Sequence, residues 1–305
     1  MKPASRLANS IEKGDFIITA EYLPRATADA SVGEAITKAF GNGVLAVNVA
    51  DNPCGVAMSS LAGSVALFRS GVEPIYQIVT RDRNRIALQS DLLGAASLGI
   101  KNVLCLSGFH QTLTRCPESA NVYDIDSIQL CAALTQMRDE QMLLDGTKIE
   151  GSFAMLTGVA ANPYLRPMEL NMIRLAKKVA AGASFIQTQA VFDTQAFAQW
   201  LDAARTEGIT DKIAILAGIW PLSSTAEAEK LRDTYTDFQI PNKIIDRLKA
   251  AGNQDAQRKE GLAMSAEIIR EIRNMDGLRG VHIFSGGKEV VVPELLAAAH
   301  FAETS

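Results

Sequence analysis

Hydrophobic and polar positions follow one arrangement repeatedly along the chain: an amphipathic segment ends at a glycine, and an apolar run of strand length begins within a few residues. The arrangement occurs six times, and its glycines are Gly43, Gly71, Gly99, Gly182, Gly208 and Gly280. A helix often ends through a residue in the left-handed conformation, which glycine adopts without steric cost. Each copy therefore indicates the helix-to-strand half of a βαβ unit.

Two further apolar runs, FIITAEY near the start and GSFAMLTG around Phe153, bring the number of expected strands to eight. The strands are expected at residues 16–22, 44–50, 74–80, 102–107, 152–158, 184–189, 213–218 and 280–285. Nearly continuous apolar runs are typical of parallel strands covered by helices on one face and packed into a barrel core on the other. A doubly wound open sheet, the competing fold, is disfavoured because the chain contains no GxGxxG loop. The pattern predicts an α/β protein, a (β/α)8 TIM barrel with extra helices.

Two segments depart from a minimal barrel. Residues 109–124 form a long polar connection after the fourth strand, and barrels place binding surfaces on such strand-to-helix loops. Residues 237–275 predict an extra helix and a longer one, interrupted near Gly252, before the last strand. We interpret this second segment as structural.

Length and composition narrow the class of protein. A chain of 305 residues accommodates one barrel of roughly 250 residues with additions, so we expect a single (β/α)8 domain over residues 1–305. A net charge of -4 is too balanced for a polyanion-binding surface, which excludes nucleic acid as an expected partner. Without an apolar leader or a membrane-length apolar run, the sequence indicates a cytoplasmic protein with no membrane partner, and we expect a homo-oligomer.

The four cysteines lie far apart, with no CxxC pair and no nearby histidine, so we expect no metal site. Cys105, inside the apolar run VLCL, is interpreted as a small buried hydrophobe rather than a redox group.

The candidate functional residues are the polar ones at the carboxyl ends of the expected strands, because these ends meet at the mouth of a barrel. Glu21 follows the apolar run FIITA, where desolvation would raise its pKa and make it a candidate general acid. An equally weighted alternative is that Glu21 forms an ion pair with Arg25 or Lys288 and holds the mouth together.

Gln187 and Gln189 alternate in FIQTQAVFD and should face the same side of one strand. Paired amides suit a heterocycle edge that both donates and accepts hydrogen bonds, and the alternative is an internal hydrogen-bond network that fills the barrel. His282 is interpreted as a core histidine. His110, at the end of the fourth strand, is the histidine that we would test for function.

Glycines mark two of the strand ends. Ser107-Gly108 is a small, permissive step that suits either a tight turn or the close approach of a planar cofactor. Gly286-Gly287, next to Lys288, suits either a turn, which we favour, or a phosphate site.

Five segments, in this order and at this spacing, resemble the methylenetetrahydrofolate reductase family: ITAEYLPR, IKNVLCLSG, GVAANP, RLAKKVAAGASFIQTQAVFD and GIWP. The resemblance covers nearly the whole chain, and its most specific part is KKVAAGASFIQTQAVFD. It implies a barrel that holds FAD. A reduced pyridine nucleotide, NADH or NADPH, and a tetrahydrofolate derivative would bind alternately against the flavin. The implied reaction is ping-pong hydride transfer between 5,10-methylenetetrahydrofolate and 5-methyltetrahydrofolate.

The resemblance also implies roles for single residues. Glu21 matches the acid that helps to open the five-membered folate ring. The implied substrate contacts are Glu21, Phe109, Gln189, Phe284 and Lys288. The implied FAD contacts are Asn48, Ala50, Gln77, Leu106, Ser107, Gly108, Tyr123, Asp124, Asn162, Arg174 and Lys178.

Several of these positions depart from the family pattern. Gln77 replaces a common histidine, Ser107 an arginine of some members and Asn162 a tyrosine of others. Lys288 stands where the family has an arginine, and Phe284 where it often has a tyrosine.

The largest departure is Phe109, which stands where the family motif after the fourth strand usually has an aspartate. Loss of a carboxylate near the flavin would stabilise the anionic reduced flavin and raise its reduction potential. We therefore hypothesise that this chain favours oxidation of 5-methyltetrahydrofolate or uses an unusual electron donor.

Two other functions were weighed against a flavin oxidoreductase. A folate- or pterin-binding subunit that handles a methyl group without NAD(P)H redox activity is the main alternative, and the departure at Phe109 keeps it open. A non-flavin barrel lyase would need a Schiff-base lysine within a strand or a carboxylate-rich metal site, and the sequence indicates neither.

Overall fold

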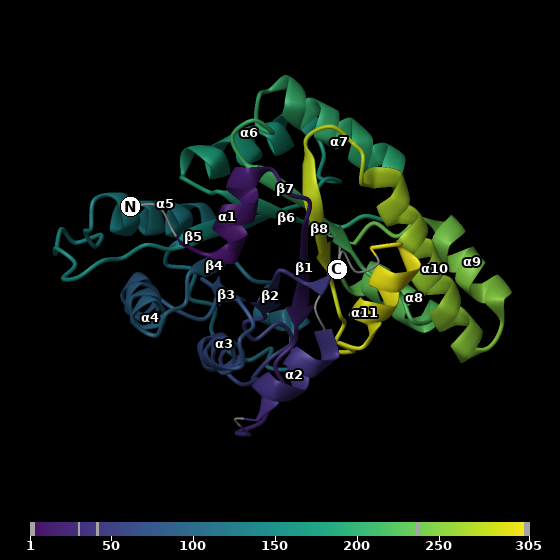
Figure 1. Cartoon of the computed structure of the whole chain (residues 1–305), viewed down its shortest axis with the longest axis horizontal. Helices are drawn as coiled ribbons and strands as arrows, with labels where there is room; N and C mark the ends of the chain where they lie inside the picture. Colours follow the sequence, from purple (N-terminus) through teal and green to yellow (C-terminus); the bar gives the residue numbers. More distant parts are fainter. Residues whose placement is uncertain (1–3, 30, 41–42, 236–237, 302–305) are drawn as a thin grey trace.

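The computed structural model describes residues 4–29, 31–40, 43–235 and 238–301. Eight parallel strands close into a barrel in chain order, with β8 pairing β1 (Figure 1). The strands are β1 Ile17–Tyr22, β2 Ala46–Val49, β3 Pro74–Val79, β4 Asn102–Leu106, β5 Leu156–Ala161, β6 Phe185–Ala190, β7 Ala214–Ile219 and β8 Leu278–Ile283. The predicted (β/α)8 fold is confirmed.

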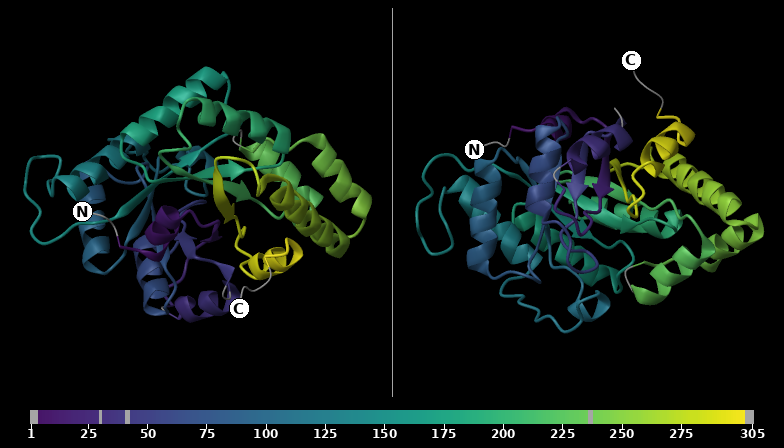
Figure 2. Two further views of the ribbon diagram at one scale, coloured as in Figure 1. Left: turned by 45° about the horizontal axis from the view of Figure 1, so that its top comes forward. Right: turned by 90° about the horizontal axis from the view of Figure 1, so that it is seen from below.

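Helices surround the barrel and alternate with its strands. They are α1 Arg6–Lys13, α2 Val32–Phe40, α3 Ser60–Arg69, α4 Arg85–Ser97, α5 Ser127–Asp139, α6 Met168–Ala180, α7 Thr194–Thr206, α8 Thr225–Thr234, α9 Asn242–Ala251, α10 Gln254–Ile272 and α11 Val291–Ala298, with a 3-10 turn at Gln111–Leu113. Figure 1 shows α8 to α11 gathered on one side of the barrel, and Figure 2 shows α9 and α10 packed there as a pair. No helix among the described residues is long and apolar enough to cross a membrane.

The extra helices lie where the sequence predicted them. α9 ends at Gly252, which has a φ of 90°, and α10 begins two residues later. The long connection after β4 is also present, and within residues 109–124 its regular structure is the short 3-10 turn.

Four of the six helix-to-strand glycines behave as predicted and the last does not, whereas the join at Gly43 includes residues 41 and 42, which lie outside the described residues. Gly71, Gly99, Gly182 and Gly208 have φ values between 63° and 94°. Before β8, however, the left-handed residue is Gly277, with a φ of 91°. Gly280 lies inside the strand instead, where a Cβ atom would come within 2.0 Å of the Ile17 carbonyl oxygen. The prediction at Gly280 is therefore wrong, because this glycine allows close strand pairing.

The fifth strand begins four residues later than predicted, at Leu156 rather than residue 152. The cause is Gln141, whose side-chain amide bonds both the N–H and the carbonyl of Phe153, each at 2.8 Å. Phe153 is thereby buried outside the strand ladder, and pairing with β4 starts at Leu156.

The barrel interior changes character along its axis. Its amino-terminal part is an apolar cluster formed by strand residues such as Ile17, Ile75, Leu104 and Phe185, and Leu7 of α1 belongs to the same cluster. Further along the same strands, buried amides, hydroxyls and a carboxyl replace the hydrocarbon side chains. The carboxyl-terminal mouth is therefore the polar end of a barrel that is closed by packing at its other end.

Candidate active site at the barrel mouth

Glu21, near the end of β1, is a buried carboxyl with 8% of its surface exposed. Desolvation raises its pKa to about 8, and a hydrogen bond from Gln77 of β3 offsets part of that shift. No ion pair joins Glu21 to Arg25 or Lys288, all three of which lie in the described part of the chain. At neutral pH the side chain is therefore a neutral acid that can donate a proton.

A buried polar network lies next to Glu21 in the barrel interior. Asn48 and Gln187 exchange amide hydrogen bonds of 2.6 and 3.0 Å, and Gln187 also donates to Thr19 at 3.1 Å. Thr19 Oγ1 lies 2.9 Å from His282 Nδ1, and burial lowers the pKa of His282 to about 3. The internal-network alternative is confirmed for Gln187, and His282 is the neutral core histidine that was predicted.

Gln189 lies two residues further along β6 than Gln187 and differs from it in burial. Its side chain is partly exposed, whereas Gln187 is only 3% exposed. The pairing of β6 with β7 shifts register between Gln187 and Ala190. Of the two amides, Gln189 is thus the one accessible at the mouth.

The loop after β4 brings four of the predicted residues together. Ser107 Oγ donates to Ser127 Oγ at 3.1 Å at the start of α5. Gly108 has a φ of 81°, and Tyr123 Oη donates to its carbonyl at 3.3 Å. Asp124 accepts two side-chain bonds from Arg85, which lower the pKa of Asp124 to about 2.

Other predicted FAD positions lie within the strands or at their ends. Asn162 is buried after β5, and its carboxamide oxygen accepts from the Tyr164 N–H at 2.9 Å. The remaining members of this set, all buried or partly buried, are Asn48, Ala50, Gln77 and Leu106. Asn48 both donates to Gln187 and accepts from it, so its side chain stabilises the barrel interior.

Arg174 and Lys178 lie one turn apart on α6. Arg174 is exposed, while Lys178 donates to the Ala160 carbonyl at the end of β5. Desolvation, followed by the charge of Arg174, lowers the pKa of Lys178 to about 8. Neither cation has a carboxylate within ion-pair distance among the described residues. Two uncompensated cations beside a strand end fit the charge of a pyrophosphate such as that of FAD.

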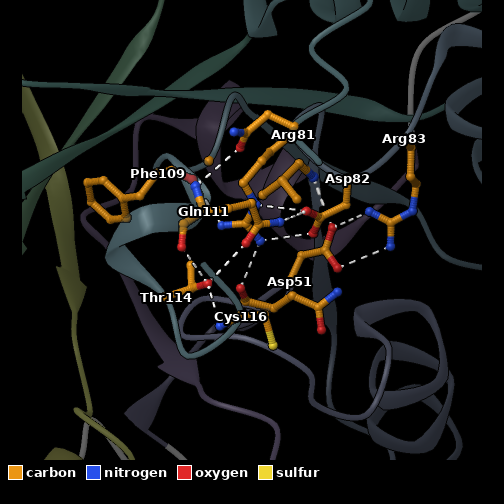
Figure 3. Close-up of polar contacts among 12 residues, drawn as sticks. Asp51, Arg81, Asp82, Arg83, Phe109, Gln111, Thr114 and Cys116 are labelled. Atoms are coloured by element: carbon orange, nitrogen blue, oxygen red, sulfur yellow. Dashed lines mark hydrogen bonds and ion pairs between the residues drawn. The ribbon is translucent and has the colours of Figure 1, made fainter. Parts of the chain in front are cut away.

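A buried guanidinium connects three of the mouth loops. Figure 3 shows Arg81, after β3, in a bidentate pair with Asp82 at 2.7 and 2.9 Å. Arg81 also donates to the carbonyls of Phe109 and Asn52, at 3.1 and 2.9 Å. Gln111 donates to Asp82 at 2.8 Å and completes the group.

A row of aromatic rings crosses from the loop after β4 to the end of β8. Phe109 packs on Tyr235 with ring centroids 4.9 Å apart, and Tyr235 contacts Phe238 at 5.9 Å. Trp220 lies 5.3 Å from both Phe238 and Phe284. Phe109 therefore belongs to an apolar wall at the mouth.

Lys288 lies beside this wall, at a cleft of about 350 Å³. Its ammonium donates to Ser223 Oγ at 2.8 Å, and Ser223 donates in turn to Glu227 at 2.6 Å. Gly286 and Gly287, with φ values of 58° and 77°, turn the chain before Lys288. His110 is exposed and caps the 3-10 turn, where its Nδ1 accepts from the Thr112 N–H at 3.3 Å.

Sequence reasoning assigned no role to Thr19, Arg81 or Tyr235. Strand alternation from Glu21 would have found Thr19, because the two residues are two positions apart on β1. Tyr235 lies at the end of α8, away from the strand ends that define a barrel mouth, so no comparable signal indicated it.

Comparison with known proteins agrees with this geometry. The sequence model of the family described as methylenetetrahydrofolate reductase matches residues 6–300. A probable methylenetetrahydrofolate reductase (NADPH) of Caenorhabditis elegans is 23% identical over 78% of this chain and 34% of its own length. A 5,10-methylenetetrahydrofolate reductase of Pectobacterium carotovorum is 23% identical over 71% of this chain and 66% of its own.

A solved structure shares the fold. It is an uncharacterized Clostridium thermocellum protein that binds two copies of 5-methyl-5,6,7,8-tetrahydrofolic acid, with a TM-score of 0.67 and 13% identity. The match covers 97% of this chain and 98% of that one. Because the family match extends over nearly the whole chain, this protein belongs to the methylenetetrahydrofolate reductase family.

Proposed function

We propose that the chain is an FAD-dependent oxidoreductase that interconverts 5,10-methylenetetrahydrofolate and 5-methyltetrahydrofolate in two half-reactions. The observation that carries the proposal is a neutral acid at the mouth of a barrel of this family: Glu21 is buried, and its pKa is about 8. A protonated carboxyl donates a proton to a nitrogen of the methylene bridge, so that the five-membered ring opens to an electrophilic iminium. Gln189, partly exposed at the same end of the barrel, would bind the pterin edge.

Most of the residues that would hold FAD follow β4 or β5, and Asn48, Ala50 and Gln77 belong to β2, its end and β3. Arg174 and Lys178 would neutralise the pyrophosphate, and the Ser107-Gly108 turn would allow the ring system to approach the backbone. FAD, when bound, supplies the hydride acceptor and donor that the side chains of the protein lack. NADH or NADPH is the proposed partner of the other half-reaction.

Phe109 supports a proposal about direction. The wall formed by Phe109 and Tyr235 places an aromatic pair where the family pattern has a carboxylate. Without that negative charge, a reduced anionic flavin would be stabilised. We therefore propose that this chain favours oxidation of 5-methyltetrahydrofolate, a direction in which the ionised form of Glu21 accepts the proton that the folate nitrogen loses when the five-membered ring closes.

Anaerobic stopped-flow spectroscopy of the purified protein tests the proposal. Flavin absorbance is followed after mixing with NADH, NADPH and 5-methyltetrahydrofolate separately, and bleaching by the folate is the expected result. A colourless protein that neither takes up FAD nor reacts with the folate would contradict the proposal. Such a protein, if it still bound 5-methyltetrahydrofolate, would be a folate-binding methyl-handling subunit.

A further inference from the structure

We infer that Arg81 is a positioning residue: its guanidinium fixes the backbone at Phe109 so that the Phe109 ring forms part of the folate-binding wall. The wall itself follows from the distances between its rings, whereas its role toward a folate rests on the proposed function. Arg81 touches neither Glu21 nor Gln189 through any of its hydrogen bonds, so its effect on a ligand would pass through Phe109.

The contacts of Arg81 connect the loops that follow β2, β3 and β4 (Figure 3). Its side chain, 2% exposed, donates to the Asn52 and Phe109 carbonyls. Its main chain adds two bonds: the Arg81 N–H donates to the Ser107 carbonyl at 3.1 Å, and its carbonyl accepts from the Val122 N–H at 2.8 Å. The segment around Phe109 is thus held to Arg81 on both sides.

The guanidinium is suited to this task because it has five donors in one plane. The bidentate pair with Asp82 uses two of them and neutralises the buried charge, which leaves the remaining donors for the two carbonyls. A lysine ammonium would satisfy Asp82 but lacks the planar fork that reaches Asn52 and Phe109 as well.

Among the described residues, the Arg81 guanidinium makes the hydrogen bond to the Phe109 main chain, whereas Tyr123 holds the preceding carbonyl, that of Gly108. The ring makes no polar contact, and its aromatic partner is Tyr235 at the far end of α8. The preceding residue, Gly108, packs against Arg81 so closely that a Cβ atom there would lie 3.2 Å from Arg81 Cβ. If the guanidinium fork is lost, the Phe109 carbonyl loses its hydrogen-bond donor, and the ring can then shift out of the wall even though Tyr123 still holds Gly108.

Arg83 offers a matched control. It lies two residues from Arg81 and is also largely buried, with 17% of its side chain exposed. It pairs with Asp51 at 2.7 Å and with Asp91 at 2.9 Å, and it makes no hydrogen bond to the loop after β4. Arg83→Lys thus weakens a buried arginine–aspartate pair without releasing Phe109.

The first experiment measures anaerobic binding of 5-methyltetrahydrofolate to protein whose FAD has been reduced beforehand, because a reduced flavin cannot take a hydride from this ligand and binding is then separate from turnover. Arg81→Lys is expected to raise the Kd by about tenfold, the equivalent of one charge-assisted hydrogen bond, and Arg83→Lys to change it by less than about twofold. Equal effects of the two substitutions would overturn the inference.

A double-mutant cycle with Phe109→Ala tests whether Arg81 acts through the ring. If it does, Arg81→Lys has little further effect on the Kd in the Phe109→Ala background. Additive effects would show that Arg81 acts by another route and would contradict the inference.

Hydrogen exchange of the ligand-free protein separates this inference from the proposed function. Arg81→Lys is expected to lose amide protection in residues 108–122, and Arg83→Lys to retain it. Unchanged protection in Arg81→Lys would overturn the inference even if the protein binds folate. Lost protection without folate binding would contradict the proposed function and leave the positioning of Phe109 intact.

Discussion

The two ends of the barrel interior are built from the same strands but by different chemistry. At the amino-terminal end, Ile17 and Phe185 belong to an apolar cluster that also includes Leu7 of α1. Two residues further along those strands, Thr19 and Gln187 are hydrogen-bonded to each other, and Glu21 follows two residues later. A shift of four positions along β1 thus leads from the packed end, through the polar network, to the mouth.

The residues that stabilise the fold and the residues that could carry chemistry therefore lie at opposite ends of the barrel interior. Buried hydrocarbon stabilises the fold through its removal from water, whereas a buried carboxyl such as Glu21 costs stability when it ionises. Because the apolar end contributes the packing, the mouth can keep an acid with a raised pKa. The following substitutions test that separation.

The largest effect on stability is expected at the packed end. Phe185 is fully buried, and its ring lies so close to Gly158 that a Cβ atom there would be 2.2 Å away. Phe185→Ala should lower the free energy of unfolding by about 3–5 kcal/mol, which urea denaturation measures. The folded fraction should keep its folate half-reaction. If Phe185→Ala had near-normal stability but a disabled folate half-reaction, the separation of the packed end from the chemistry at the mouth would be contradicted.

At the mouth, Glu21→Gln should affect chemistry instead. We expect a folate half-reaction at least about 10²-fold slower, while FAD binding and flavin reduction by the donor stay largely intact, as stopped-flow mixing can show. An equal loss in both half-reactions would indicate a structural role.

Glu21→Gln should also reveal how much the buried carboxyl lowers the free energy of unfolding when the unfolded chain can ionise it. The folded protein keeps the Glu21 proton up to a pH of about 8, whereas the unfolded chain releases it near 4.5. Wild-type stability should therefore decline relative to Glu21→Gln as pH rises between those values.

The polar network between the two ends should show an intermediate effect. Gln187→Leu would remove both amide hydrogen bonds of Asn48 and the donor to Thr19, and it should lower the free energy of unfolding by about 1–3 kcal/mol. Gln189→Leu is the matched control, because that side chain is partly exposed, and we expect it to reduce folate affinity with little change in stability. A loss of stability in Gln189→Leu together with a loss of folate affinity alone in Gln187→Leu would contradict this account of the two glutamines.

The smallest effect is expected at Phe109. Phe109→Asp should lower the reduction potential of the bound flavin, since a new carboxylate opposes the reduced anion, while Phe109→Leu should leave it nearly unchanged. Spectroelectrochemical titration measures both. A potential that is the same in Phe109→Asp and in wild type would remove the basis for the proposed direction.

The sequence predicted the parts of this molecule that local pattern determines. Strand runs and helix-ending glycines are set by neighbouring residues, so the barrel and the position of Glu21 followed directly. The start of β5 did not, because Gln141 removes Phe153 from the ladder through contacts across 12 positions. The role of Arg81 depends on backbone carbonyls of two other loops, and carbonyls leave no signature in side-chain pattern.

The pH dependence of the folate half-reaction tests the central claim most directly, with 5,10-methylenetetrahydrofolate mixed against pre-reduced protein. If Glu21 is the acid, the rate should fall with one ionisation as pH rises through about 8, and Glu21→Gln should lack that decline. A decline that persists unchanged in Glu21→Gln, or a wild-type decline near pH 4.5, would contradict the assignment of Glu21 as the neutral acid at the mouth.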